Sequence, residues 1–329
     1  MIYETVKRLS PLIPPRNILI VTSRLQLGVL SQKVPSIPRS NLLAEPFGRN
    51  TAPCALLSAL HIQQRNPEAL MILLPADHFI GNMKGFLRTL KIAAWFAARS
   101  DYLVTIGVRP THAETGYGYI QKGKIIAQIE NTPIFQARSF REKPNRSTAE
   151  GYLKKGNFFW NSGMFIWRVE AFLQSFQKHL PHIFDEMAKI GPRLGTSMEK
   201  KALEKAYSKI QPISIDYGIM EKAEKVAVLE AKFPWSDVGS WSALAQIWPA
   251  DERGNAFWPY SQSNRGKVLV KDSSGCLLHS QDKLIAVIGL KDIIVVESGG
   301  AILVCPKDRS QDVRQILEEI KRKGWKGYT

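Results

Sequence analysis

The sequence is poor in the groups that build disulfide-bonded, zinc-binding or membrane-spanning proteins. Its 329 residues include three cysteines, Cys54, Cys276 and Cys305, which lie far apart and form no CxxC pair. Such a set supports neither a disulfide framework nor a zinc site, and it suits a reducing compartment. No apolar run approaches the roughly 18 residues that a membrane span needs, and the first ten residues lack the apolar core of a signal peptide. We therefore expect a cytoplasmic protein with no membrane association.

Signatures of several common enzyme classes are missing as well. There is no Gly-x-Ser-x-Gly and no Walker motif, and His61, His179, His182 and His279 are isolated, so no nucleophile triad or metal cluster is indicated.

Basic charge is abundant, because 45 Lys and Arg residues outnumber 29 Asp and Glu residues and give a net charge of +16. This excess favours anionic partners such as nucleotides, sugar phosphates or nucleic acid. The densest basic run, Lys321–Lys326, suits a solvated helix end better than a nucleic-acid patch.

The spacing of apolar residues predicts an α/β fold. Leu70–Leu74 is a continuous apolar run that predicts a strand buried on both faces, with Asp77 and His78 just beyond its end. Expected strands and helices alternate in the order typical of a doubly wound, Rossmann-like parallel sheet. They are strands at 17–22, 41–45 and 102–108 and helices at 2–9, 51–66 and 84–99. Short β runs and a terminal helix follow, so we expect two domains, residues 1–258 and residues 259–329.

Two pairs of residues suit the binding of a phosphorylated ligand. Asp77 and Asp237 each lie in a turn after an expected strand, where two carboxylates can share one Mg²⁺ through oxygen, although a simple turn cap also explains Asp77. Glu142 and Lys143 place an acceptor for sugar hydroxyls beside a cation for phosphate. An exposed ion pair is the alternative for these two neighbours.

Two further stretches suit a base and a sugar. Glu45 and Arg49–Thr51 can read a purine edge, since a carboxylate accepts two N–H donors in plane, but a plain strand-to-helix turn with Thr51 as the N-cap explains them equally well. Gly116 and Gly118 allow a backbone to approach a flat sugar face, or they simply begin a hairpin. Farther along, Ser147 and Glu150 are expected to form a helix capping box.

Seven stretches form an ordered set, EPFGRNTAP, LPADHFI, TGYGYI, FREKP, WNSGMFIW, SIDYGIMEK and WSDVGSW. In this order they closely resemble the mannose-1-phosphate guanylyltransferases, from about residue 2 to the end of the chain. The resemblance implies a nucleotidyltransferase sheet followed by a small C-terminal unit like a left-handed β-helix, which is a reasonable surface for a homodimer. It also implies a role for each matching residue. Guanine nucleotide contacts are implied for Glu45, Asn50 and Thr51, and Mg²⁺ binding for Asp77 and Asp237. Contacts with mannose are implied for Gly118, Glu142, Asn161 and Asp216, and a contact with its phosphate for Lys143.

The reaction implied by the resemblance joins GTP and mannose 1-phosphate to give GDP-mannose and pyrophosphate. Family members begin with a strand and a glycine-rich loop that carries a catalytic arginine, and the matching motifs of this sequence start beyond both. We therefore expect neighbouring strand edges to be exposed and to invite aggregation or a partner. Two alternatives follow: a non-catalytic sugar-nucleotide-binding or regulatory relative, and a basic nucleic-acid binder, which lacks the motifs of known modules.

Overall fold

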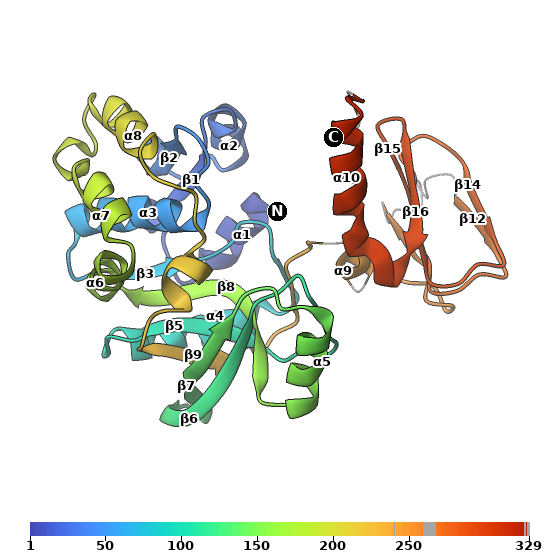
Figure 1. Ribbon diagram of the computed structural model, residues 1–329, viewed down its shortest axis with the longest axis horizontal. Helices are drawn as coiled ribbons and strands as arrows, with labels where there is room; N and C mark the ends of the chain where they lie inside the picture. The colour runs from blue at the N-terminus through green and yellow to red at the C-terminus, as the bar shows by residue number, and fades with distance from the viewer. Residues whose placement is uncertain (240, 246, 259–267, 326, 328–329) are drawn as a thin grey trace. The chain divides into compact units, whose positions relative to one another are not determined.

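The computed structural model describes residues 1–239, 241–245, 247–258, 268–325 and 327. The chain packs as two compact units, Met1–Trp235 and Ser236–Thr329. The first is an α/β unit, and the second consists mainly of β-strands with a terminal helix (Figure 1). The domain boundary expected between residues 258 and 259 stays a prediction, and residues 259–267 lie outside the described part of the chain.

The first unit is built on a six-stranded sheet with the strand order β3-β8-β5-β9-β7-β6. Its strands are β3 (Leu70–Leu73), β5 (Leu103–Val108), β6 (Tyr119–Ile129), β7 (Thr132–Arg141), β8 (Phe158–Arg168) and β9 (Val226–Glu230). Strands β5 and β9 are parallel, whereas β8 is antiparallel to β3 and β5. The parallel pairing expected from the sequence is therefore found in this sheet only between β5 and β9, and its other strand pairs are antiparallel. Strand β8 pairs antiparallel with β6 and then continues between β3 and β5, which makes the sheet mixed.

Four short strands stand outside this sheet. Strands β1 (Ile20–Ser23) and β2 (Leu42–Glu45) form a parallel pair of their own, and β4 (Phe79–Ile80) and β10 (Trp235–Ser236) are only two residues long. In the described part of the chain, β3 pairs with β8 alone, so it is an edge strand. Its predicted burial on both faces is wrong for this reason: Met71 is buried, but the other three residues of β3 are only half-buried.

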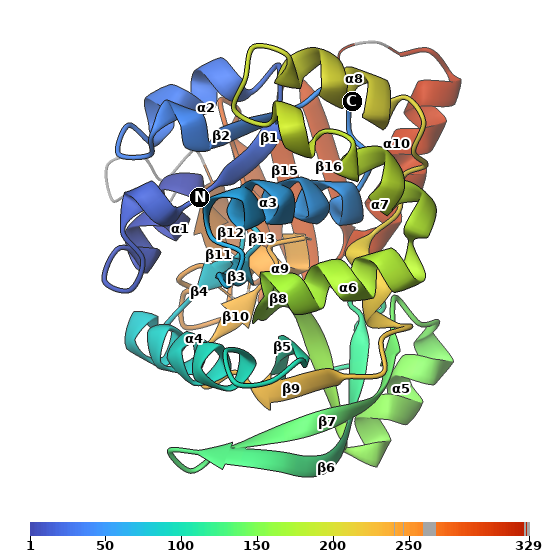
Figure 2. The same cartoon turned by 90° about the vertical axis from the view of Figure 1, so that its left-hand side faces the viewer.

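Helices cover both faces of the sheet. They are α1 (Ile2–Leu9), α2 (Leu27–Lys33), α3 (Thr51–Arg65), α4 (Met83–Ala97), α5 (Arg146–Lys155), α6 (Val169–His179), α7 (Pro181–Ala188) and α8 (Glu199–Tyr207). Figure 2 shows α4 on one side of β5 and β8, with α3 and α6 on the other. The doubly wound arrangement expected from the sequence is confirmed by this pair of layers.

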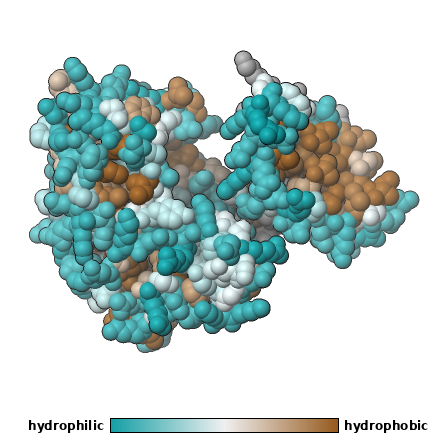
Figure 3. All heavy atoms as spheres, viewed as in Figure 1, coloured by the Kyte–Doolittle hydropathy of each residue, from teal (hydrophilic) through white to brown (hydrophobic). Residues whose placement is uncertain are grey.

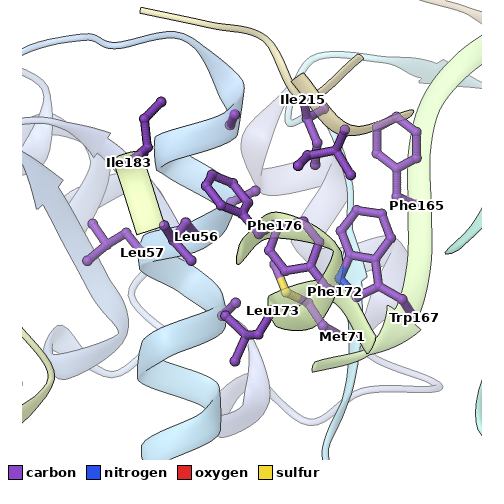
Figure 4. Close-up of a cluster of buried hydrophobic side chains, with 14 of the residues drawn as sticks. Leu56, Leu57, Met71, Phe165, Trp167, Phe172, Leu173, Phe176, Ile183 and Ile215 are labelled. Carbon is purple, nitrogen blue, oxygen red and sulfur yellow. The ribbon is translucent and has the colours of Figure 1, made fainter. Parts of the chain in front are cut away.

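The side chains of β8 show why two helical layers are needed. Successive residues of a strand point to opposite faces. Phe165 and Trp167 pack with α3 and α6, while Met164 and Ile166 pack with α4. On the first face the Trp167 ring stacks on Phe172 of α6, with centroids 4.6 Å apart (Figure 4). A strand that is apolar on both faces must be covered on both, and this cover anchors the strands that carry the candidate site.

Two helix caps differ from the sequence expectation. Helix α3 begins at Thr51, but its N-cap is Asn50, whose side-chain oxygen accepts the Thr51 N–H at 2.8 Å. Helix α5 is capped by Asn145, which accepts the Thr148 N–H at 2.9 Å, in place of the expected capping box of Ser147 and Glu150. In both helices an asparagine immediately before the first helical residue takes the cap position, because its short side chain reaches the free N–H groups.

The second unit has the parallel strand pairs expected of a β-helix-like coil. Its elements are α9 (Trp241–Ala245), β11 (Ala256–Trp258), β12 (Val268–Lys271), β13 (Leu277–His279), β14 (Ile285–Ile288), β15 (Ile293–Ser298), β16 (Ala301–Pro306) and α10 (Val313–Arg322). Strand β13 lies between β11 and β15 and is parallel to both, and β12 is parallel to β14. Strand β16 returns antiparallel to β15. One of the short β runs expected from the sequence, residues 267–270, begins at Lys267, which lies outside the described residues.

Apolar side chains remain exposed on the second unit. Leu269, Ile288, Ile302 and Val304 each expose about 60% or more of their surface, and Figure 3 shows hydrophobic atoms gathered over this unit. None of the described helices of the chain is both long enough and apolar enough to cross a bilayer.

Candidate functional site

Five residues assigned from the motifs meet in the first unit. Asn161 of β8 donates its backbone N–H to the Gly118 carbonyl at 2.8 Å, and its side-chain amide donates to the Asp216 carboxylate at 2.9 Å. The Glu142 carboxylate lies directly against Gly118, because a Cβ on that glycine would overlap it. The Lys143 ammonium group pairs with Glu142 at 3.3 Å. Two carboxylates, one amide and one ammonium group therefore form a single network, which we call the acidic cluster.

Burial decides the proton affinity of the acidic cluster. The pKa of Asp216 is raised to about 6, first by desolvation and second by the nearby Glu142 charge, while hydrogen bonds to its carboxylate and the Lys143 charge oppose the shift. Desolvation also raises the pKa of Glu142; the adjacent Lys143 lowers it, and the charge of Glu221 raises it. Burial therefore disfavours the charged form of each carboxylate, at a cost in free energy. Hydroxyl donors from a ligand would offset this cost, which makes the cluster suited to bind a polyhydroxylated molecule.

A second group of candidate residues lies at the end of β2. The Tyr207 hydroxyl donates to the Glu45 carboxylate at 3.0 Å, and the Arg49 guanidinium donates to the Tyr207 carbonyl at 3.0 Å. Arg49 also lies over the Phe47 ring, 5.0 Å from its centroid. Burial raises the pKa of Glu45, and the hydrogen bond from Tyr207 opposes the shift. We call these residues the Glu45 cluster; its carboxylate is held in one orientation by Tyr207.

One short segment joins the two clusters. The Ala52 N–H donates to the Ile213 carbonyl at 3.1 Å, and the Ile215 N–H donates to the Thr51 hydroxyl at 2.9 Å. Ile215 is buried in the hydrophobic cluster beside Phe165 (Figure 4). The next residue, Asp216, begins a single π-helical turn that ends at Met220. The position of Asp216 is therefore tied to the start of α3, where the Glu45 cluster lies.

The loop after β3 places Asp77 at the surface. Asp77 is exposed, and the next residue, His78, accepts a hydrogen bond from the Trp235 indole N–H at 3.1 Å. The same loop packs against β8, since a Cβ on Gly163 would lie 3.3 Å from the Pro75 ring. The carboxylate assigned to Mg²⁺ is thus carried by a loop that the neighbouring strand and Trp235 hold in place.

Asp237 belongs to the second unit, so its relation to Asp77 stays a prediction. Its carboxylate accepts the Gly239 N–H at 2.9 Å, and the residue between them, Val238, has a φ of 55°. Among the described residues no three His, Cys, Asp or Glu side chains gather as a metal cage. Single carboxylates nevertheless fit Mg²⁺, because this ion keeps several waters and binds through one or two carboxylates and the phosphates of a substrate.

Two candidate residues hold an unfavourable backbone conformation. Asn50 has a φ of 68° and Lys143 a φ of 44°, in the region that L-amino acids rarely adopt. Such conformations cost about 1–3 kcal/mol each and are found preferentially at binding sites, where the surrounding structure maintains them. Glu130 and Asn131, in the turn between β6 and β7, also have a positive φ, so this conformation by itself does not distinguish a binding residue from a turn residue.

Two residues that shape these clusters were not predicted from the sequence. Tyr207 lies at the end of α8, outside every motif, and its partner Glu45 is 162 residues away. No local pattern could have identified it. Glu221 accepts the Glu142 N–H at 2.9 Å and lies in the motif SIDYGIMEK, so its place in a matching stretch was a signal that could have been used.

Comparisons with known proteins agree with the two-unit organisation. Residues 1–254 match a family described as nucleotidyl transferase, and residues 266–320 match a family described as the MannoseP isomerase/GMP-like beta-helix domain. A mannose-1-phosphate guanylyltransferase from Klebsiella pneumoniae is 36% identical over 332 residues, which cover 98% of this chain and 67% of the relative. One from Escherichia coli is 32% identical over 333 residues, which cover 100% of this chain and 70% of the relative.

A solved structure shares the fold of almost the whole chain. It is a Thermus thermophilus protein described as a mannose-1-phosphate geranyltransferase, with a TM-score of 0.82 and 32% sequence identity, and the match covers 97% of this chain and 89% of that chain. The family assignment made from the seven motifs is thereby confirmed. The chain belongs to the nucleotidyl transferase family, in the group of the mannose-1-phosphate guanylyltransferases.

Proposed function

We propose that this protein transfers GMP from GTP to α-D-mannose 1-phosphate, forming GDP-mannose and releasing pyrophosphate. A phosphate oxygen of the sugar phosphate attacks the α-phosphorus of GTP, and the bond to the β-phosphate oxygen breaks, so that pyrophosphate leaves with the electron pair. The attacking phosphate has a second pKa of about 6 and is already ionised at neutral pH. No general base is needed, and positioning and charge stabilisation account for the catalysis.

The acidic cluster is the observation that carries this proposal. Glu142 and Asp216 offer carboxylate acceptors, and Asn161 adds an amide to the same network. A hexose presents several hydroxyl donors and pairs well with such a set. Lys143 lies next to the carboxylates and supplies a cation for the phosphate of the same ligand. A hexose phosphate therefore matches the cluster in both its hydroxyls and its charge.

The Glu45 cluster is proposed to bind the guanine base. A carboxylate fixed in plane accepts the two N–H groups on one edge of guanine. Glu45 is oriented by the Tyr207 hydroxyl, and Asn50 and Thr51 follow at the start of α3, where the positive end of the helix dipole favours anions such as the nucleotide phosphates. The segment 213–216 connects this cluster to the acidic cluster, as a two-substrate reaction requires.

Mg²⁺ is proposed as the cofactor, with Asp77 and Asp237 as its protein ligands. The ion would neutralise phosphate charge and orient the triphosphate. The exposure of Asp77 leaves its carboxylate accessible to a hydrated ion.

A homodimer is proposed as well, and the exposed Ile302 and Val304 of the second unit support it. The cytoplasmic location expected from the sequence stays a prediction.

Pyrophosphate release tests the proposed reaction. We expect release only when GTP, mannose 1-phosphate and Mg²⁺ are all present, with slower release when ATP or glucose 1-phosphate replaces its counterpart. Asp77→Asn and Asp237→Asn should each raise the Mg²⁺ concentration for half-maximal rate by about tenfold or more, because one charged ligand is lost. Asp185→Asn removes an exposed carboxylate of α7 and serves as the matched control.

The outcomes of this assay separate the alternatives. Binding of GDP-mannose without any pyrophosphate release would favour the non-catalytic relative. Binding to oligonucleotides that weakens steeply with salt would favour the nucleic-acid binder. A rate that does not depend on Mg²⁺ would contradict the metal assignment while leaving the reaction itself intact.

Replacement of Tyr207 by phenylalanine tests the Glu45 cluster. Tyr207→Phe removes the hydroxyl that donates to Glu45 at 3.0 Å and leaves the ring in place. A hydrogen bond to a charged group is worth about 1.5–3 kcal/mol, so we expect KM for GTP to rise by about tenfold or more. KM for mannose 1-phosphate should change little, because Tyr207 is a positioning residue on the nucleotide side only.

Tyr3→Phe is the control for this substitution, since Tyr3 of α1 is 53% exposed and its hydroxyl lies outside both clusters. An equal rise of both KM values in Tyr207→Phe, together with a lower Tm, would mean that Tyr207 acts only on the stability of the fold.

A further inference from the structure

A groove of about 550 Å³ lies between helix α4 and the turn that joins β6 to β7. Its lining residues on the helix and on the turn are Lys84, Leu87, Arg88, Lys91, Ile92, Trp95, Ile129 and Glu130. The Arg88 guanidinium links the two elements, because it donates to the Glu130 carboxylate at 3.1 Å. Helix α4 and the turn can be followed in Figure 2. None of the lining residues belongs to the acidic cluster or to the Glu45 cluster, and the volume is typical of a small-molecule site.

Four of the lining residues follow one face of α4. Lys84, Arg88, Lys91 and Trp95 recur at the spacing of successive helical turns, which places their side chains in a row. At a rise of about 1.5 Å per residue, Lys91 lies about 6 Å along the helix axis from Trp95, and Arg88 lies about 10 Å from it. The row thus begins with three cationic side chains and ends at an indole.

The cations of this row are available to an anionic ligand. No carboxylate in the described part of the chain lies within 4.0 Å of the Lys84 or Lys91 ammonium group. Arg88 pairs with Glu130, but the two side chains are 64% and 61% exposed, so this ion pair contributes little to stability. A ligand with more than one negative charge would therefore gain favourable contacts along the row at little cost.

The indole at the end of the row offers a surface for a flat ring. Trp95 lines the groove and is 49% exposed. The Arg99 guanidinium lies over the ring, 4.2 Å from its centroid, and helps to hold the indole in place. Leu87, Ile92 and Ile129 add aliphatic contacts beside it. Stacking on an aromatic side chain favours any nucleobase, because every base has a flat face.

We propose that the groove between α4 and the β6–β7 turn binds a nucleoside diphosphate. The base would stack on Trp95, and the phosphates would lie beside Lys91 and Arg88, with Lys84 as a third cation. One ribose separates the base of a nucleotide from its first phosphate, which suits the single helical turn between Trp95 and Lys91. The Glu130 carboxylate would accept the ribose hydroxyls. An acidic peptide would satisfy the cations but leave the indole without a flat partner, so it matches the groove less well.

The lining residues also predict a low selectivity for the base. Apart from Glu130, assigned to the ribose, the lining side chains are aliphatic, aromatic or cationic, and none is an amide or a hydroxyl that reads a base edge. We therefore expect ADP and GDP to bind the groove with similar affinity. ADP is no substrate of the proposed reaction, so the inference goes beyond that reaction and can be tested without it.

Calorimetric titration with ADP tests the site. The purified protein should bind ADP saturably, and more weakly as the salt concentration rises, because charge pairs contribute to the contact. Trp95→Leu keeps an apolar side chain but removes the ring, and it should weaken ADP binding by about tenfold or more. Lys91→Gln removes one cation and should weaken binding by about threefold. Both side chains are exposed, so both variants should keep the wild-type Tm.

Matched controls come from other parts of the chain. Trp325 is 56% exposed and the Lys323 ammonium lies 5.0 Å from its ring centroid, so Trp325→Leu removes a comparable indole. Lys200→Gln removes an exposed cation from α8. Both variants should bind ADP like wild type. Photolabelling with 8-azido-ADP, followed by peptide mapping, should modify residues within 83–97 or 129–132.

Several results would overturn the proposal. The groove is not a nucleotide site if Trp95→Leu binds ADP as tightly as Trp325→Leu, or if the photolabel is found only elsewhere in the chain. Equal affinity for inorganic pyrophosphate and ADP would mean that the groove attracts anions without recognising a base. Tighter binding of ADP-glucose than of ADP would make a nucleotide sugar the ligand, and displacement of ADP by a lower concentration of hexaglutamate would make an acidic protein segment the occupant.

Discussion

Replacement of Gly118 by alanine should lower kcat/KM for mannose 1-phosphate by about 100-fold while leaving the fold intact. The new Cβ would overlap the Glu142 carboxylate and lie 3.3 Å from the Asn161 Cβ. The atom that must move is the end of a flexible side chain, so the cost in stability is small. Displacement of that carboxylate by about 1 Å misplaces the bound sugar, and errors of this size cost about 100-fold in rate.

Gly151→Ala is the matched control for this experiment. Gly151 lies in α5, and nothing lies within 4 Å of the position of its added Cβ. Alanine there should leave activity unchanged and stabilise the helix by about 0.5–1 kcal/mol. Steady-state kinetics and thermal unfolding of both variants distinguish the two effects. Normal activity in Gly118→Ala would show that the Glu142 carboxylate does not contact the substrate.

Asp216→Asn should make the protein more stable and less active at the same time. The pKa of Asp216 is raised from 3.8 to about 6 by desolvation and by the charge of Glu142. The folded protein therefore binds a proton more tightly than the unfolded chain, and stability is lost as pH rises from about 4 through about 6. Above that range wild type carries a buried charge, and each unit of pKa shift corresponds to about 1.4 kcal/mol. The neutral amide avoids this cost.

Chemical denaturation at several pH values measures the effect. The difference in unfolding free energy between Asp216→Asn and wild type should be roughly 1–3 kcal/mol in favour of the variant at pH 8, and it should vanish below about pH 4. KM for mannose 1-phosphate should rise by about tenfold or more, because a charged acceptor for the sugar hydroxyls is lost. Asp185→Asn, on the exposed side of α7, should change neither quantity. A variant less stable than wild type at pH 8 would contradict the assigned desolvation.

Several helices and strands could be predicted because the spacing of their apolar residues follows a helical or a strand period. Helix α1 was expected at residues 2–9 and spans Ile2–Leu9, and β5 was expected at 102–108 and spans Leu103–Val108. Helical and strand periods depend on neighbours within a few residues, which the sequence displays directly. Cap positions were less accurate: Asn50 and Asn145 replaced the expected Thr51 and Ser147. Several side chains near a helix start compete for the same N–H groups, and the local backbone decides among them.

The burial of β3 and the contacts between the site residues could not be predicted from local sequence, because both depend on the whole fold. Leu70–Leu73 has the composition of a central strand, yet in the described chain it is an edge strand, because no local pattern states which strand lies beside it. The motifs named Asn161 and Asp216 separately, but the hydrogen bond between them spans 55 residues.

The sequence by itself determined the order of helices and strands, the family, and which side chains suit a sugar, a phosphate and a base. Only the tertiary structure decided that Tyr207 orients Glu45 and that α4 and the β6–β7 turn border one groove. The physical reason is that side-chain chemistry and local periodicity are properties of short stretches. Distances between remote residues, and the burial that shifts the pKa of Asp216, arise only when the sheet and its helical layers assemble.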